Sequence, residues 1–183
     1  MDFTHSLPPS LHLLGNLRSL LITRSKLGDI RMIGKLKKLE ILGFEWSNIE
    51  EFPKEIASLT HLRLLNLVNC SKLRVIPRNL ISSLTCLEEL YMGNCHIEWE
   101  LDGNQSESNN ASLGELRNLH NLKTLDISIR DTSVLPEDLR FLSELERYSI
   151  LIGDMWEWYI ETSRTLKLTD SLWTIISLTT VEK

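Results

Sequence analysis

The chain has 183 residues, which suits a single domain, and its hydrophobic content of 42% is ordinary for a folded protein. A formal net charge of −5 argues against a dedicated nucleic-acid binder, which would carry a basic stripe. No run of about 18 apolar residues occurs, so we expect no membrane span, and the segment starting at Met1 lacks the basic and apolar regions of a secretory signal.

Leucine recurs along the chain in one spacing, LxxLxxLxL. The pattern covers residues 14–22, 36–44, 59–67, 81–92, 113–127 and 139–150, and Leu166 and Leu168 indicate a degenerate seventh copy. In the last LxL of each copy the two apolar side chains point inward and the residue between them faces out, as in a β-strand. The predicted outward strand centres are Leu21, Gly43, Asn66, Tyr91, Asp126, Ser149 and Lys167.

The segments between these strands predict short helical turns, opened by Pro53, Pro77 and Pro136 at a favourable first helical position. Strands and turns in this order are the leucine-rich repeat signature. We therefore predict an α/β solenoid, a curved array with short parallel strands on its concave face and short helices and turns on its convex face. The repeats span residues 1–170, and residues 171–183 form an irregular apolar tail that either caps the array or remains exposed.

Residues 98–112 interrupt the repeats with a polar, acidic stretch. Such a composition predicts a loop that buries too little surface to become ordered, so residues 100–111 are expected to be mobile. The simpler interpretation is a tolerated insertion. The alternative is a loop that contacts a partner and is anchored by Trp99.

No catalytic, cofactor-binding or metal-binding site is predicted, and we expect no enzyme activity. The stretch from Gly28 to Leu36 resembles a phosphate-binding loop but has the wrong glycine spacing, and Leu36 replaces the hydroxyl that would hold magnesium. The histidines show no metal-ligand spacing. Cys70 and Cys95 share one repeat position just past the strand, where Ser25 and Ser47 stand earlier, and we expect these side chains to turn inward and satisfy the backbone.

The concave face is the candidate binding surface for a protein partner. Aromatic and apolar side chains on neighbouring strands, Trp46, Val68 and Tyr91, are predicted to form one patch with a mixed-charge rim. The alternative is that these side chains only shield one another. The predicted protein-binding residues are Leu21, Arg24, Glu45, Trp46, Asn66, Val68, Tyr91, Asp126, Ile129 and Leu151.

The residues between the leucines resemble one protein family. The stretches 3–11, 16–20, 33–42, 53–56 and 62–70 are similar to the repeat region of plant nucleotide-binding leucine-rich repeat disease-resistance proteins of the coiled-coil subclass. The segments 81–94 and 152–158 are especially characteristic of that family. The resemblance covers roughly residues 1–170. Closing turns such as Glu51-Phe52-Pro53 lack the glycine that is usual in extracellular plant receptors.

This resemblance implies a cytoplasmic segment of an intracellular immune receptor. Its expected partners are a pathogen effector, a guarded host protein or the receptor's own nucleotide-binding domain. The nucleotide-binding domain itself has no counterpart in these residues, so nucleotide binding is not carried over to the chain. The alternative is a cytosolic leucine-rich repeat scaffold or an F-box-type substrate receptor, although the chain shows no convincing F-box.

Overall fold

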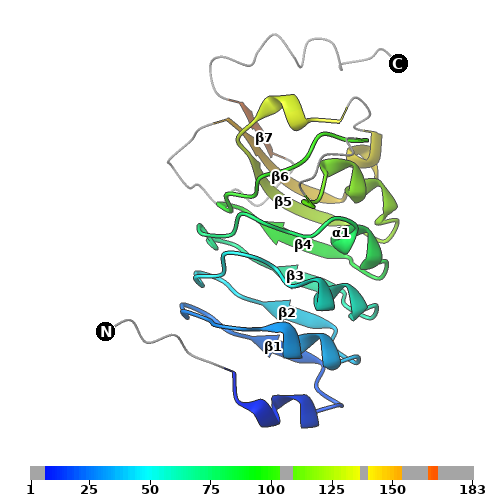
Figure 1. The fold of residues 1–183 in the computed structure, drawn as a ribbon. Coiled ribbons are helices and arrows are strands. Elements are labelled where there is room, and N and C mark those ends of the chain that lie inside the picture. Colours follow the sequence, from blue (N-terminus) through cyan, green and yellow to red (C-terminus); the bar gives the residue numbers. More distant parts are fainter. Residues whose placement is uncertain (1–6, 104–108, 137–139, 154–164, 169–183) are drawn as a thin grey trace.

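The computed structural model describes residues 7–103, 109–136, 140–153 and 165–168. Seven parallel strands form one sheet in chain order, so each strand lies beside the next one along the sequence (Figure 1). The predicted solenoid of short parallel strands is confirmed. The strands are β1 (Ser19–Leu21), β2 (Ile41–Gly43), β3 (Leu64–Asn66), β4 (Glu89–Met92), β5 (Thr124–Ile129), β6 (Arg147–Ile152) and β7 (Thr165–Leu168).

Short helices return the chain on the opposite side of the sheet (Figure 1). In the described part of the chain all but one are short 3-10 helices, in which backbone hydrogen bonds span three residues rather than four. Pro53 lies ahead of η3 and Pro77 lies ahead of α1, so neither proline occupies the first helical position. The Pro53 carbonyl accepts a hydrogen bond from the Ile56 amide, and the Pro77 carbonyl accepts one from the Leu80 amide, at 3.1 Å each. The helices are η1 (Pro9–Leu13), η2 (Arg31–Lys35), η3 (Lys54–Ser58), α1 (Leu80–Ser83), η4 (Leu113–Asn118), η5 (Thr132–Val134) and η6 (Arg140–Glu144).

The register aligns the predicted outward strand centres across the sheet. Leu21 is level with Gly43, and the row continues through the predicted centres of β3 to β6. At β7 the row shifts by two residues, because Thr165 is level with Ser149 and Lys167 is level with Leu151, on the same side of the sheet. The leucine spacing is degenerate there, so the pattern alone did not specify how far β7 slides along β6.

The core is a stack of inward side chains between the sheet and the convex turns. Leu42, Leu65 and Leu90 are at most 1% exposed, and burying one such side chain contributes about 1.5–3 kcal/mol. Phe44 and Phe52 pack edge to face, with ring centroids 6.0 Å apart at 84°. Since each of these residues rests on the neighbouring repeats, no repeat could bury its leucines alone.

The inward small residues past the strands satisfy the backbone as predicted. The Cys70 thiol donates to the Phe44 carbonyl at 2.9 Å, and the Cys95 thiol donates to the Leu67 carbonyl at 3.0 Å. Burial raises the pKa of Cys70 to about 11 and that of Cys95 well above its ordinary value. Both thiols therefore stay protonated at neutral pH and can donate these bonds.

The insertion is ordered at both ends, which contradicts the prediction of one loop without packing across residues 98–112. Trp99 is buried at 8% exposure, so its indole packs in the core and does not itself face a partner. The amide of Glu100 donates to Ala111 at 2.9 Å, and the amide of Ala111 donates to Ile76 at 2.7 Å. The insertion thus leaves and rejoins the array through backbone bonds, while residues 104–108 and the predicted tail 171–183 lie outside the described part of the chain.

Candidate protein-binding face

Leu21, one of the predicted face residues, is largely exposed, at 63%. It lies over Gly43 of the neighbouring strand, because a Cβ atom built on Gly43 would stand 2.7 Å from the Leu21 Cδ2 atom. A larger residue at position 43 would displace Leu21. The glycine therefore leaves a shallow apolar surface between β1 and β2.

In each of the first four repeats, one residue just past the end of the strand adopts a left-handed backbone. Arg24, Trp46, Asn69 and Asn94 have φ values of 52°, 59°, 62° and 55°. Their amides continue the ladder beyond the strands: Arg24 donates to Glu45, Trp46 to Val68 and Asn69 to Gly93, at 2.9, 3.0 and 2.9 Å. Asparagine tolerates this backbone, whereas a bulky side chain is strained in it.

Trp46 is therefore unusual for its position. It carries a large indole where the next two repeats carry asparagine, and 57% of its surface is exposed. Asn94 donates from Nδ2 to Asn69 Oδ1 at 2.8 Å, so the two asparagines also link their repeats. The Trp46 indole forms no such link among the described residues and instead faces solvent at the edge of the sheet.

Polar side chains hold the middle of the face in place. The Asn66 amide donates to the Glu45 carboxylate, and its Oδ1 accepts from the Val68 amide at 3.0 Å. Both side-chain groups of Asn66 are thus engaged, and Val68 is half-buried beside them. Glu45, Asn66 and Val68 consequently form a fixed part of the surface.

Tyr91 forms the next part of the face and is half-buried. Its hydroxyl donates to Glu89 Oε2 at 2.5 Å, and Arg147 Nη2 lies 3.9 Å from the same carboxylate oxygen. Burial raises the pKa of Tyr91 to about 12, and the bond to Glu89 adds to that shift. Tyr91 is therefore a neutral hydrogen-bond donor at all physiological pH values.

Asp126 is the acidic group of the face that burial affects most. Burial raises its pKa from 3.8 to about 6, and a hydrogen bond from Ser149 partly opposes that shift. Asp126 lies between Tyr91 and Ser149 in the register of the sheet. At neutral pH it is a partly buried carboxylate without a salt bridge in the described part of the chain.

One predicted face residue is wrong. Ile129 is only 4% exposed because β5 keeps its alternation for six residues, so Ile127 and Ile129 point inward while Asp126 and Ser128 face out. Leu151 is half-buried on β6, and Arg24 is exposed at the edge. Arg147 was missed as a face residue, although it stands two residues before the predicted strand centre Ser149 and shares its side of the sheet. Glu89, which the sequence places in the mixed-charge rim, stands in the same way two residues before Tyr91.

Charges of alternating sign run along the edge where the strands begin. Each residue of this row donates its amide to the carbonyl of the preceding one, at 2.8–2.9 Å. Two pairs close into side-chain salt bridges: Arg18 with Glu40, and Arg63 with Glu88 at 2.7 Å from Nε and 3.1 Å from Nη2. The predicted mixed-charge rim thus contains internally paired charges. The row is Arg18, Glu40, Arg63, Glu88, Lys123 and Glu146.

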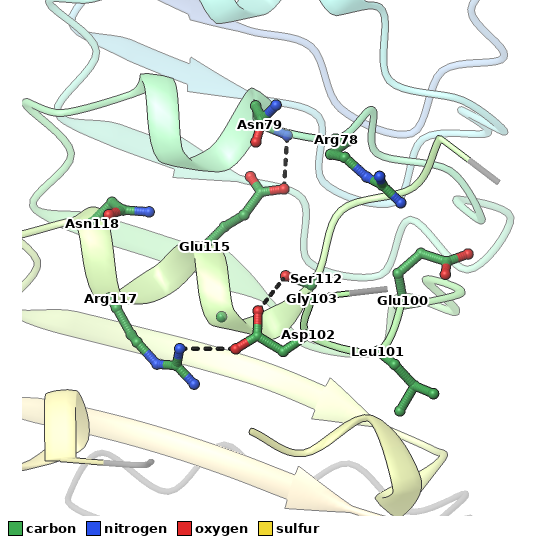
Figure 2. A pocket seen from close by; sticks show the side chains of 11 residues that line it. Arg78, Asn79, Glu100, Leu101, Asp102, Gly103, Ser112, Glu115, Arg117 and Asn118 are labelled. Atoms are coloured by element: carbon green, nitrogen blue, oxygen red, sulfur yellow. Dashed lines mark hydrogen bonds and ion pairs between the residues drawn. The ribbon is translucent and has the colours of Figure 1, made fainter. Parts of the chain in front are cut away.

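A hollow of about 500 Å³ lies on the convex side, between α1, η4 and the insertion (Figure 2). Its acidic groups already have partners within the chain. Glu115, 7% exposed, accepts the amides of Asn79 and Ser82 at 2.7 and 3.1 Å, and Asp102 pairs with Arg117 at 2.8 Å. These contacts tie the insertion to the repeats and leave the concave face as the candidate binding surface.

Within the described residues, no helix is long and apolar enough to cross a membrane. The same part of the chain contains no group of three or more histidine, cysteine, aspartate or glutamate residues placed to hold a metal ion.

Comparison with known proteins supports both the fold and the resemblance. A family profile described as a leucine-rich repeat region matches residues 4–179. Disease resistance protein At4g27190 of Arabidopsis thaliana is 28% identical over 129 residues, which are 70% of this chain but only 13% of that protein. The leucine-rich repeat domain of the type III effector XopL has the same fold at a TM-score of 0.62 and 24% identity, over 81% of this chain and 48% of that one. The similarity to plant resistance proteins is thereby confirmed.

Proposed function

Because the chain belongs to the leucine-rich repeat family, whose folds mediate protein–protein binding, we propose that its concave face recognises a protein partner in plant defence. In this proposal the chain is the recognition segment of a cytoplasmic immune receptor of the coiled-coil, nucleotide-binding class. Its partner is a pathogen effector, a guarded host protein or the receptor's own nucleotide-binding domain. The receptor class rests on the similarity to a resistance protein of which this chain matches a small part.

The exposed indole of Trp46 is the observation that carries the proposal. A bulky residue in a left-handed backbone costs about 1–2 kcal/mol, and an exposed side chain recovers little of that by burial. Leu21, also largely exposed, lies over Gly43 of the neighbouring strand on the same face. Tryptophan is among the residues that contribute most at protein interfaces, so binding provides a reason for the strain.

The surroundings of Trp46 suit recognition of a specific protein. Glu45 and Asn66 are held in place beside it by their mutual hydrogen bond, so they offer fixed polar groups next to a flat apolar surface. Apolar anchors bordered by polar groups are the usual anatomy of a protein interface. Preorganised side chains also lower the entropic cost of association.

The experiment is a comparison of three variants as bait in extracts of plant tissue. Trp46→Asn and Leu21→Asn change the face, while Leu101→Asn removes a similarly exposed apolar side chain from the insertion. We expect proteins retained by the wild type and by Leu101→Asn to be lost by at least tenfold from the other two baits, as measured by quantitative mass spectrometry.

Thermal unfolding separates binding from folding in the same experiment. Trp46→Asn should raise the stability of the isolated chain by about 1 kcal/mol, because asparagine tolerates the left-handed backbone. A variant that is more stable but binds less would support the interface. An unchanged set of retained proteins for both concave-face variants would refute it.

A further inference from the structure

Two arginines converge on one histidine past the ends of three neighbouring strands. Arg130 Nη2 lies 2.6 Å from His96 Nε2, and Arg74 Nη1 donates to the main-chain oxygen of His96 at 3.2 Å. Arg74 follows β3, His96 follows β4 and Arg130 directly follows β5. Three repeats thus each contribute one residue to what we call the Arg74–His96–Arg130 cluster.

The two guanidinium charges of this cluster lack carboxylate partners. In the described part of the chain, neither Arg74 nor Arg130 forms a salt bridge. Several arginines elsewhere on the surface differ in this respect, because a carboxylate pairs with each of Arg18, Arg31, Arg63 and Arg117.

Acidic residues do lie nearby along the backbone. Arg74 donates its amide to Glu50 at 2.9 Å, and Glu98 donates its amide to Arg74 at 2.9 Å, so both are its neighbours in the ladder. Asp131 follows Arg130, but its carboxylate accepts the Ser133 amide at 2.9 Å. None of these carboxylates forms a salt bridge with the cluster among the described residues.

His96 contributes an acceptor to the cluster through its imidazole. Its Nε2 faces a guanidinium, which can only donate, so the neutral imidazole carries its proton on Nδ1. That Nδ1 atom is buried and has no hydrogen-bond partner in the described part of the chain. Burial lowers the pKa of His96, and the charges of Arg130 and Arg74 lower it further.

We propose that the Arg74–His96–Arg130 cluster binds a phosphoryl group, as free phosphate or as a phosphate monoester. Each guanidinium has five N–H donors and uses one here, so most of its donors remain available. Two guanidiniums on separate repeats match a tetrahedral dianion with several acceptor oxygens, whereas one arginine already satisfies a carboxylate in a bidentate pair. The cluster is separate from Trp46 and Leu21, so this inference does not rest on the proposed concave-face partner.

A bound dianion would counteract the positive charge that Arg74 and Arg130 place around His96. It offsets the two positive charges that hold the pKa of the imidazole down, so the pKa of His96 rises on binding. Once protonated, Nε2 no longer accepts from Arg130, and that guanidinium can turn both of its ends to the phosphoryl oxygens. Phosphate binding is therefore coupled to proton uptake by His96.

The test is an NMR titration of the whole 183-residue chain with sodium phosphate, against sodium chloride at equal ionic strength. The His96 resonances are assigned with His96→Gln, and His12, His61 and His120 serve as internal references. We expect a saturable rise in the pKa of His96 with phosphate alone. Because this readout uses the wild-type chain, it does not depend on any variant folding.

Variants then assign the binding to the two arginines. Arg74→Gln and Arg130→Gln should each weaken phosphate binding by about tenfold, because each removes a charge-assisted contact. Arg63→Gln is the matched control, since that guanidinium is already engaged by Glu88, and it should leave binding unchanged. All three arginines are exposed, so the melting curves of the variants should stay close to that of the wild type.

A phosphoserine peptide and its unphosphorylated form distinguish the source of the phosphoryl group. Tighter binding of the phosphopeptide than of free phosphate assigns the site to a phosphorylated protein, and equal or weaker binding assigns it to free phosphate. The proposal is overturned if phosphate and chloride act alike on His96, or if Arg63→Gln weakens binding as much as Arg74→Gln does.

Discussion

Asp126 shows how a single side chain on the concave face couples stability to pH. Its carboxyl lies between Tyr91 and Ser149 and is partly buried, and burial raises its pKa from 3.8 to about 6. The charged form is therefore less favourable in the folded chain than in the unfolded chain. Its contribution to stability is fully present below pH 3.8 and is lost as the pH rises through about 6.

Asp126→Asn should consequently stabilise the chain at neutral pH. The amide keeps the shape of the side chain but cannot ionise, so the gain should be on the order of 2 kcal/mol at pH 7.5 and disappear near pH 4. Urea unfolding at several pH values measures the difference. Asp131→Asn is the control: the bonds to Ser133 lower the pKa of Asp131, so that substitution should give no gain at neutral pH. A gain for Asp126→Asn that did not vary with pH would contradict the assignment.

At the scale of elements, close packing between successive convex turns explains the glycine-containing stretch between Gly28 and Leu36. Gly34 in η2 is buried, and a Cβ atom there would lie 2.5 Å from the main-chain oxygen of Glu55 in η3. The hydroxyl of Ser58 donates to the Gly34 carbonyl at 2.9 Å, which ties the same two turns together. This glycine therefore serves the close approach of two backbones.

Gly34→Ala should destabilise the chain because the clash is with backbone rather than with a flexible side chain. A cost of about 1–3 kcal/mol is typical when extra atoms are forced into a packed site. Gly15→Ala is a matched control, since nothing lies within 4 Å of a Cβ atom at that position. Thermal or urea unfolding of the two variants checks the prediction, and equal stability of both would show that η2 and η3 separate easily.

The returning end of the insertion depends on Asn110, which is 4% exposed. Its Oδ1 accepts the amides of Ile76 and Ala111 at 2.8 and 3.2 Å, and its Nδ2 donates to the carbonyls of Arg74 and Glu98. One side chain thereby joins two repeats and both ends of the insertion. Amino-acid composition does not predict such a contact, because a polar residue in an acidic stretch indicates a solvated loop.

Asn110→Ala should leave several buried backbone groups unpaired and cost about 1–3 kcal/mol. Asn109→Ala serves as the control, because that neighbouring side chain is exposed. Hydrogen exchange followed by mass spectrometry should show faster exchange at Ile76 and Ala111 only in the Asn110 variant. Unchanged protection at both amides would show that the side chain does not hold the insertion in place.

For the whole molecule, stability is shared between neighbouring repeats because the strands pair only with those adjacent in sequence. Leu65, at the middle of β3, is 1% exposed and level with Leu42 on β2 and Leu90 on β4. A cavity at this position should therefore destabilise first the two repeats that flank it.

Leu65→Ala should lower the free energy of unfolding by about 2–5 kcal/mol. The loss of hydrogen-exchange protection should be larger in β2 and β4 than in β6, because coupling passes from neighbour to neighbour. Leu13→Ala, at a position that is 73% exposed, should change neither quantity appreciably. Uniform loss of protection along the chain would indicate instead that the array unfolds as one cooperative unit.

The sequence by itself determined the repeat architecture, the outward residues of the first six strands and the inward thiols of Cys70 and Cys95. It could do so because the period of two within a strand and the repeat spacing are local properties, and each repeat obeys the same packing constraint. Only the tertiary structure decided the register of β7, the burial of Ile129 and Trp99, the left-handed backbone of Trp46 and the cluster around His96. These depend on how far a strand extends and on contacts between residues that are distant in sequence, such as Ile76 with Asn110, which no local pattern encodes.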